Sequence, residues 1–488
     1  MDQQLKFGET LISDIVFDAR SRDELPQLLK GLQSLYCSEK IRPRLFDTLQ
    51  ELVPQNISSK IGRNGMNLWR IFVLGSLRLC CNIDHDRLHD LANYHIQVRQ
   101  MLGHSIWDLE KHYALQTLKD NLALFTPEIL DKINQIVVEH GHEVFNKKAD
   151  EILKGSCDSF PLETNVHYPT DISLLWDAIR KIITLTMQVC NNFNISDWRQ
   201  GKLNLRKVKA GFRRVQQAKR STSKNETVKA EKDQLVINAH TVYINLAQGY
   251  MDKVRQTLKK LPPSDITSHC KALQIEEYFN DAELLIDQIK RRVMNGETIP
   301  QNEKIFSIFE RHTEWISKGK AGVPVELGLK VCIVKDQYGF LLHHRVMENE
   351  TDDKIAVSIV EETRQRFSSF KSCSFDKGFH SKSNQEKLGK ILDHVILPRK
   401  GKLSEAARKI EGAETFKEAR RKHSAVESSI NALENHGLDR CPDLGLHGFK
   451  RYTALAVVAR NIQIIGDRLQ QKELKKLQRQ GRKQQLAA

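Results

Sequence analysis

The sequence has no run approaching the roughly 20 apolar residues that a membrane-spanning helix requires. Its N-terminal stretch, Met1–Lys6, lacks the apolar core of a signal peptide. It also lacks any C-x-x-C pair, because its nine cysteines are scattered singly apart from Cys80-Cys81. A zinc ribbon or a disulfide framework is therefore not expected. These absences predict a soluble, intracellular protein without a membrane partner, whose cysteines are buried, reduced thiols.

Length and charge set the next bounds. A chain of 488 residues is long enough for about two to four domains. Its 76 lysines and arginines outnumber its 61 acidic residues, for a formal net charge of +15. Such a surplus favours a polyanionic partner such as nucleic acid, although lysine-rich solvated surfaces have a similar composition.

The first part of the chain, from about Ser21 to Phe145, has a helical pattern and no convincing strand. Its most apolar run, Asn67–Cys81, is short and interrupted by arginines, which is typical of a core helix. A second helix is expected after an acidic cap at Asp84. A helix, a short turn and a helix are compatible with a DNA-binding module, and equally with an ordinary helical bundle.

The pattern changes at Ile152–Phe160, which predicts a short strand with Asp158 near its end. Leu162–Val166 either extends this strand or returns from it. Either Thr170 or Asp171 is then expected to cap a helix. Taken alone, an aspartate in the position of Asp158 is more often a turn or cap residue.

A long, polar, helical insertion follows, from Ile172 to roughly Ser317. Within it, cations at steps of four, three and four predict one basic stripe of a helix, beside an apolar stripe of Leu205, Val208, Phe212 and Val215. No acidic residue alternates with the cations, which favours phosphate contact over a merely solvated face. The stripe consists of Lys202, Arg206, Lys209 and Arg213.

After a composition shift at Gly319–Pro324, alternating apolar residues predict a strand over Val325–Ile333 with one buried face. Asp336–Gly339 is a predicted turn, and Phe340–Met347 is the returning strand of the hairpin. A helix from about Asp353 to Phe367 is expected to lead into the next strand.

That next strand ends at Asp376, which is followed by a glycine turn. A capping box from Ser383 to Glu386 predicts a helix over about Asn384–Asp393, and His394–Pro398 is one more short strand. The order of hairpin, helix, strand, helix and strand indicates a mixed α/β sheet.

The last part of the chain is basic and helical. Arg399, Lys400 and Lys402 form a compact loop that suits either a phosphate backbone or a solvated turn. Thr415–His436 is predicted as one long helix, with Glu427 beside its apolar stripe, although such a glutamate taken alone is more often an ordinary surface residue. Gly445–Ile465 is a closing apolar helix, and Lys472–Gln485 has the composition of a disordered tail.

Two aspartates at strand ends and a glutamate on a later helix have a specific chemical use. Phosphodiester cleavage by two divalent ions about 4 Å apart needs several carboxylate ligands, one of them shared between the metals. Carboxylates suit Mg²⁺, whereas histidine and cysteine suit zinc. Without cations the gathered carboxylates would repel one another and raise some of their pKa values.

Several motifs resemble those of bacterial insertion-sequence DDE transposases, specifically the ISNCY-type group, over most of the chain from about Asn64. Any one of these motifs alone is weak, but their combination is specific. They are Cys157–Phe160 with Glu163–Asp171, Ser374–Ser381, Leu397–Gly401, His423–Ser428, Gly437–Cys441 and Gly448–Tyr452.

The resemblance implies a ribonuclease H-like catalytic domain whose acid triad is Asp158, Asp376 and Glu427, holding two Mg²⁺ ions, or Mn²⁺ in their place. It implies a helical N-terminal DNA-binding domain (1–145), a catalytic domain split into 146–171 and 319–466 by a helical insertion (172–318), and a basic tail (467–488). It further implies a DNA transposase in the prokaryotic cytoplasm, associated with the nucleoid. Such an enzyme binds terminal inverted repeats as a homodimer and joins a 3′-hydroxyl to target DNA.

The sequence departs from related families around the glutamate. The positions that often hold a tyrosine, an arginine and a lysine hold Arg420, His423 and Glu434 here. DNA-end contacts are therefore expected from Arg420, Lys422 or the basic loop. Two alternatives remain: an element-derived DNA-binding protein that no longer cuts, and a metal-dependent nuclease that cleaves DNA without strand transfer.

Overall fold

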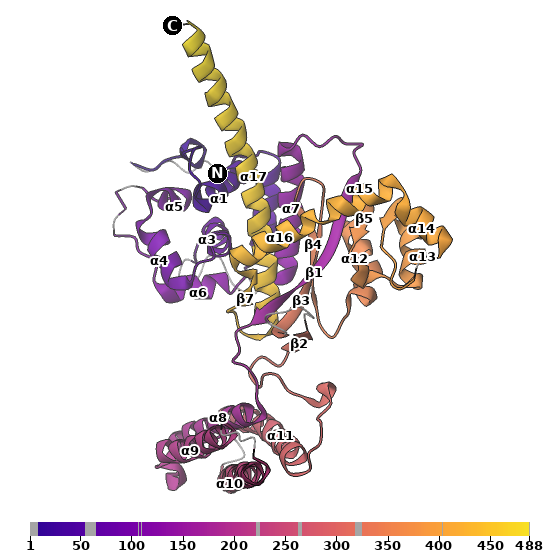
Figure 1. The fold of residues 1–488 in the computed structure, drawn as a ribbon. Helices are drawn as coiled ribbons and strands as arrows, with labels where there is room; N and C mark the ends of the chain where they lie inside the picture. The colour runs from indigo at the N-terminus through magenta and orange to yellow at the C-terminus, as the bar shows by residue number, and fades with distance from the viewer. Residues whose placement is uncertain are drawn as a thin grey trace. The chain divides into compact units, whose positions relative to one another are not determined.

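The computed structural model describes residues 8–53, 65–105, 107–108, 110–220, 225–261, 266–317, 325–402 and 404–487. The chain forms two compact units: a larger unit of Met1–Asn165 with Glu314–Ala488, and a helical unit of Val166–Thr313 (Figure 1). The predicted boundary at residues 318–319 and the start of the resemblance at Asn64 lie outside the described residues. Among the described residues, no helix is both long and apolar enough to cross a membrane.

The larger unit is mixed α/β and is built on an open sheet flanked by helices. Its central strand is β1 (Leu153–Thr164), with β3 (Val325–Lys335) antiparallel on one side and β5 (Phe370–Phe375) parallel on the other. β3 also pairs antiparallel with β2 and β4, whereas β6 runs parallel to β5 and β7 pairs with the end of β1. These strands are β2 (Glu314–Ser317), β4 (Leu341–Met347), β6 (His394–Ile396) and β7 (Arg440–Cys441).

Two predictions about these strands need correction. Asp158 does not lie near the end of a short strand, because Leu162 and its neighbours extend β1 to Thr164 and place Asp158 in the middle. β3 is the predicted strand, but its C-terminal part buries both faces: Cys332 and Val334 are as inaccessible as Val331 and Ile333. The reason is that α12 (Asp352–Arg366) covers the second face.

The N-terminal helices do not form a core of their own. They share one hydrophobic core with the sheet and with the last helix, α17 (Gly445–Ala487). The seven helices are α1 (Glu24–Cys37), α2 (Ile41–Gln50), α3 (Leu68–Cys80), α4 (His85–Tyr94), α5 (Ile96–Met101), α6 (Leu115–Leu122) and α7 (Pro127–Val144).

The helix predicted over Asn67–Cys81 is the buried helix α3. Asn67 caps its start, and its residues from Ile71 to Cys80 are all buried, so α3 leaves no face for a DNA groove. Asp84 caps α4, as predicted, by accepting the backbone N–H of Arg87 at 2.7 Å.

α1 and α17 cross at very short range because each has a glycine at the crossing. A Cβ atom on Gly31 would lie 2.2 Å from the carbonyl oxygen of Ile462, and one on Gly466 would lie 1.8 Å from that of Gln27. Both distances are shorter than any normal contact. Only glycine therefore permits this approach of the two helices.

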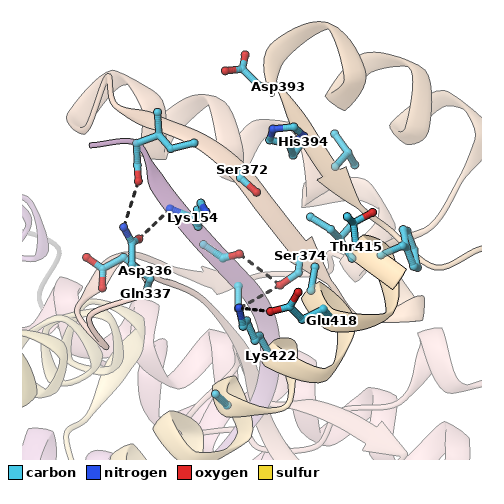
Figure 2. Close-up of a pocket in the computed structure, with 18 of the residues that line it drawn as sticks. Lys154, Asp336, Gln337, Ser372, Ser374, Asp393, His394, Thr415, Glu418 and Lys422 are labelled. Atoms are coloured by element: carbon cyan, nitrogen blue, oxygen red, sulfur yellow. Dashed lines mark hydrogen bonds and ion pairs between the residues drawn. The ribbon is translucent and has the colours of Figure 1, made fainter. Parts of the chain in front are cut away.

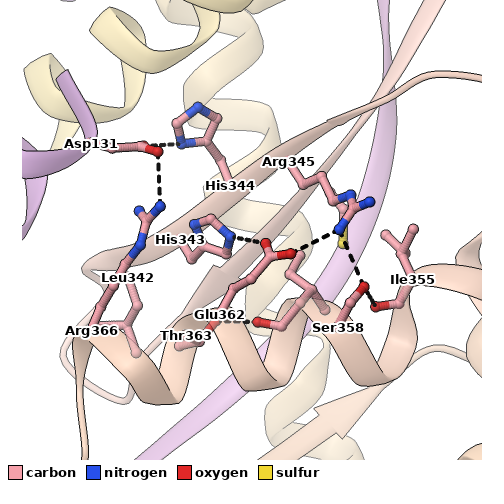
Figure 3. A network of polar contacts seen from close by, with 12 residues as sticks. Asp131, Leu342, His343, His344, Arg345, Ile355, Ser358, Glu362, Thr363 and Arg366 are labelled. Carbon is pink, nitrogen blue, oxygen red and sulfur yellow. Dashed lines mark hydrogen bonds and ion pairs between the residues drawn. The ribbon is translucent and has the colours of Figure 1, made fainter. Parts of the chain in front are cut away.

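A polar network joins α7, β4 and α12 (Figure 3). Asp131 accepts a hydrogen bond from Arg366 at 2.8 Å, and its other oxygen lies 3.6 Å from Nδ1 of the buried His344. The preceding residue of β4, His343, is hydrogen-bonded to Glu362 at 2.8 Å. The network therefore ties a helix of the N-terminal region to the sheet and to α12.

The helix after Asp376 starts earlier than predicted. A short 3-10 turn, Lys377–Phe379, comes first, and α13 spans Lys382–Ile391. Ser381, not Ser383, is its cap, and its hydroxyl accepts the backbone N–H of Asn384 at 3.1 Å. The predicted capping box is therefore wrong, because Ser383 already lies inside the helix.

The long helix predicted over Thr415–His436 is broken. α15 (Glu414–His423) ends at Ser424, α16 (Ala425–Leu433) follows, and a π-helical turn spans Glu434–Leu438. Within this turn, Gly437 has a φ of +94°, which is not a helical value. α14 (Glu405–Gly412) precedes the series.

The described part of the helical unit has four long helices in the stretch where a helical insertion was predicted. Thr170 forms a capping box with Ser173 at the start of its first helix, and its helices enclose their own apolar core. The unit contains α8 (Asp171–Asn192), α9 (Gly201–Arg220), α10 (Glu226–Leu258) and α11 (Ile266–Met294).

Two further predictions fail near the surface. The segment Lys472–Gln485 is helical, because α17 continues to Ala487. The nine cysteines are all free, but Cys37 and Cys270 are exposed and not buried as expected.

Candidate active site

Two of the predicted acids lie beside each other in the sheet. Asp158 is in β1, and Asp376 directly follows the parallel strand β5. Cys157 is in register with Phe375, so each aspartate lies one residue beyond a matched pair. Successive residues of a strand point to opposite faces, and matched residues point to the same one. Both carboxylates therefore lie on one face of the sheet.

The sheet opens beside Asp158. Pairing of β1 with β5 ends at Cys157, and pairing with β7 begins only at Glu163. Within the described residues, the stretch between them has no strand neighbour on this side, and α16 contacts β1 instead. Asp158 is therefore at the point where the parallel half of the sheet divides.

Asp158 is the acid whose environment is most unusual. Burial raises the pKa of its carboxyl to about 6, against the hydrogen bond from the backbone N–H of Ser159. The charges of Asp376, Asp352 and Glu427 raise this pKa further. The predicted triad thus lies within mutual electrostatic range.

Glu427 comes from the first turn of α16 and has an exposed side chain. His423 lies at the end of α15, and its Nδ1 is 3.0 Å from the hydroxyl of Ser374, two residues before Asp376. Burial lowers the pKa of His423, while Asp376 and Glu427 oppose that shift. α15 ends at Ser424, and Glu427 belongs to the first turn of the next helix, α16.

Asp352 was missed by the sequence reasoning. It is the first residue of α12, and it accepts hydrogen bonds from the hydroxyl of Ser159 at 2.6 Å and from Lys330 at 3.1 Å. Ser159 follows Asp158, so these contacts lie on the opposite face of the sheet. The predicted helix began one residue later, at Asp353, and the pair of acids at its start was the available signal.

The basic loop after β6 lies against the turn that follows Asp376. The ammonium of Lys400 donates to the carbonyl oxygen of Gly378 at 2.8 Å, and Lys402 is exposed. Arg399 is half-buried, and its backbone N–H donates to Glu411 at 3.0 Å. The loop therefore brings positive charge close to the second acid.

The two remaining predicted cations lie on α15. Arg420 is exposed, and its charge contributes to lowering the pKa of His423, which places it near the acids. Lys422 is also exposed but is paired with Glu418 at 2.7 Å. Of the two, Arg420 is the better placed to meet a phosphate.

An open cavity of about 1340 Å³ lies on the face of the sheet that carries the two aspartates, although none of the three acids is among the residues that line it (Figure 2). Its floor includes Lys154 and Ser156 of β1 and Ser372 and Ser374 of β5, which alternate in step with Asp158 and Asp376. α15 forms the opposite wall with Phe416 and Lys422. Ser156 and Ser374, each two residues before an aspartate, are the lining residues nearest in sequence to the acids.

The basic stripe of α9 is exposed as predicted, and its apolar partners pack into the core of the helical unit. None of the ion pairs in the described part of the chain involves its cations. Arg206, Lys209, Arg213 and the neighbouring Arg214 line a shallow cavity of about 280 Å³. Lys202 lies on the same helix, nearer its start, and is also exposed.

The three acids have the oxygen donors that Mg²⁺ prefers. The pKa of Asp158 is raised mainly by burial and further by the charges of Asp376, Asp352 and Glu427, and a cation bound beside this carboxylate would oppose both effects. Across the described ranges, however, no three histidine, cysteine, aspartate or glutamate side chains are grouped closely enough to hold one metal ion. The three carboxylates are therefore chemically suitable ligands for Mg²⁺, and Asp376 and Glu427 lie close enough to affect the pKa of Asp158. Their side chains are nevertheless not grouped as the ligands of one ion.

Comparisons of the chain with protein-family models, with curated proteins and with solved structures found no match.

Proposed function

We propose that the protein is a Mg²⁺-dependent DDE transposase that binds the ends of an insertion sequence, cleaves DNA there and joins the 3′-hydroxyl to a target. The observation that carries the proposal is the pair of Asp158 and Asp376 on one face of adjacent parallel strands, with Glu427 in electrostatic range. The mixed sheet supports the ribonuclease H-like part of the proposal, since the first acid lies on its central strand and the second follows the neighbouring parallel strand.

Asp158, Asp376 and Glu427 would hold the ions. When bound, two Mg²⁺ ions activate a water or a 3′-hydroxyl and stabilise the leaving oxygen. The chain itself positions DNA: Lys400 and Arg420 attract phosphates near the acids, and the cavity beside α15 admits the strand. Ser374 holds the ring of His423 and so anchors the end of α15 against β5.

The cations of α9 supply a second contact with DNA. Lys202, Arg206, Lys209 and Arg213 face solvent along one helix without acidic neighbours. Each phosphate that they neutralise releases counterions, so they strengthen binding and make it dependent on salt. This contact positions DNA without reading its sequence.

The test is to incubate the purified protein with labelled element ends, Mg²⁺ and a target plasmid. We expect strand-transfer product from the wild type, a loss of at least about 100-fold with Asp376→Asn because a metal ligand is removed, and full activity with Glu386→Gln. Glu386 is an exposed acid on α13 and serves as the matched control.

Other outcomes separate the alternatives. Cleavage without joining would identify a nuclease. Binding of the ends without cleavage would identify an element-derived DNA-binding protein. Undiminished strand transfer by Asp376→Asn would refute the assigned triad.

A further inference from the structure

The last helix extends beyond the fold that it completes. Gln470 is the last buried residue of α17 up to Gln480, where the description of side chains ends, and it donates to the carbonyl oxygen of Ser21 at 2.9 Å. Lys472 donates to that of Val144 at 2.7 Å, and Glu473 pairs with Lys30. From Lys475 to Gln480 every residue is exposed, and the ribbon of α17 projects past α1 and α7 (Figure 1). The projecting segment therefore makes no contribution to the core.

This segment carries charge of a single sign. After Glu473 the sequence contains no further acid, but it contains five cations: Lys475, Lys476, Arg479, Arg482 and Lys483. None of the ion pairs within the described residues involves the first three. The cations thus face solvent without local compensation.

Helical geometry gathers the three cations on one side. At 3.6 residues per turn, Lys475, Arg479 and Lys476 fall within an arc of about 100°. Leu474 and Leu477 lie outside this arc, on the other side of the helix. The result is a rod with a cationic stripe and a weakly apolar back.

We infer that the projecting end of α17 binds the phosphate backbone of duplex DNA through Lys475, Lys476 and Arg479. The inference rests on the proposed DNA-binding function and adds a contact that needs neither the acids nor α9. A second copy of the helix is a poor occupant, because like charges would meet without acidic partners. A lipid surface is also a poor occupant, because Leu477 is the one large apolar side chain exposed between Lys475 and Gln480.

The experiment measures the affinity of the full-length protein for a random-sequence duplex over a range of salt concentrations. The test variant is Lys475→Gln/Lys476→Gln/Arg479→Gln, which keeps good helix formers. The control, Lys40→Gln/Arg44→Gln/Lys132→Gln, removes the same formal charge from exposed cations that are each paired with a glutamate.

We expect the slope of log K against log salt to fall by about 2 to 3 in the test variant, since each phosphate contact contributes about 0.9. Affinity near 0.1 M salt should fall by about tenfold or more, and the control should keep the wild-type slope. The charge-reversal variant Lys475→Glu/Lys476→Glu/Arg479→Glu should weaken binding further. Thermal unfolding of each variant shows whether the fold is retained.

Each contrary result has a separate meaning. A wild type without salt-dependent duplex binding would overturn both this contact and the proposed function. An unchanged slope in the test variant, with the wild type binding, would overturn the contact alone. A change in mass by light scattering with an unchanged slope, or tighter binding to anionic vesicles than to the duplex, would assign the segment to self-association or to lipid.

Discussion

Asp158 is a carboxylate that is both largely buried and close to other carboxylates, a combination that would not be expected of a purely structural residue. Burial and three neighbouring carboxylates raise the pKa of its carboxyl to about 6, so the ionised form that a metal requires is disfavoured by the fold. A carboxylate in this environment lowers the stability of the fold at neutral pH, and a cation bound beside it would offset that cost. The burial of this carboxylate near other carboxylates therefore accounts both for the cost in stability and for the proposed metal binding.

The first prediction concerns this residue. Asp158→Asn should raise the free energy of unfolding at pH 7 without metal by on the order of 1–2 kcal/mol, because the raised pKa reports a disfavoured charge and partial exposure reduces the full effect. Thermal unfolding with and without Mg²⁺ checks it. Mg²⁺ should raise the Tm of the wild type and of Glu386→Gln but not that of Asp158→Asn. Equal Mg²⁺ responses in all three would contradict the prediction.

His344 carries a second prediction, on pH. Burial lowers its pKa to about 4, against the attraction of Asp131. A histidine whose folded pKa is below its unfolded value of about 6.5 stabilises the fold fully above pH 6.5 and loses that contribution as the pH falls toward 4. The loss should approach about 3 kcal/mol, at 1.36 kcal/mol per pH unit.

Urea unfolding at several pH values between 7 and 4.5 measures this loss. The decrease in unfolding free energy between pH 7 and pH 4.5 should be smaller in His344→Gln than in the wild type, whatever the stability of the variant at pH 7. His394→Gln changes an exposed histidine and should keep the wild-type pH dependence. If His344→Gln also kept it, the buried network would not be responsible.

At the level of the elements, the sequence predicted most helices and strands because their patterns are local. The hairpin β3–β4, α12, β5 and β6 follow from alternation, turn residues and helical spacing, and the capped start of α8 follows from Thr170. What failed depended on contacts that no local pattern carries. Nothing in the spacing of Val325–Ile333 showed that α12 would cover the other face of β3.

The break between α15 and α16 is a similar case. The apolar stripe continues through both helices, since Val426 and Leu433 are buried while Phe416, Ala419 and Ile430 are partly buried. Periodicity alone therefore predicts one helix. α15 contacts β5 whereas α16 contacts β1, so the two parts of the stripe pack against different strands, which periodicity does not reveal.

The third prediction concerns the crossing of α1 and α17. Gly466→Ala should lower the free energy of unfolding by about 1–3 kcal/mol or more, because its Cβ would collide with the carbonyl oxygen of Gln27. Gly389→Ala in α13 is the control: its Cβ would meet nothing within 4 Å. That change should be neutral or stabilise by up to about 1 kcal/mol through helix propensity. Equal Tm values for the two variants would show that the helices can separate without cost.

At the level of the whole molecule, the two units have separate hydrophobic cores. Sequence reasoning identified the helical insertion from its composition and its helical spacing. It did not show that the N-terminal helices join the sheet in one core, because their apolar faces are equally compatible with a bundle. It also did not place Asp158 next to Asp376, since residues so distant in sequence are brought together only by strand pairing.

The fourth prediction follows from the separate cores. Calorimetry of the full chain should resolve two transitions. Ile182→Ala, in the core of the helical unit, should lower the midpoint temperature of only one transition. The corresponding loss of unfolding free energy should be about 2–5 kcal/mol. Leu329→Ala, in the sheet, should lower only the other. A single transition that both variants shift equally would show one cooperative unit.

The register at Gly328 shows how closely the two ends of the helical unit's connections lie in the sheet. Gly328 pairs with Glu163 of β1 on one side and with Glu314 of β2 on the other, immediately beside the points where the chain leaves for the helical unit and returns. These points are two strand spacings apart, about 10 Å. A connection of four or five residues spans such a gap, so a short loop in place of the helical unit would leave the pairing of every described strand in the sheet unchanged.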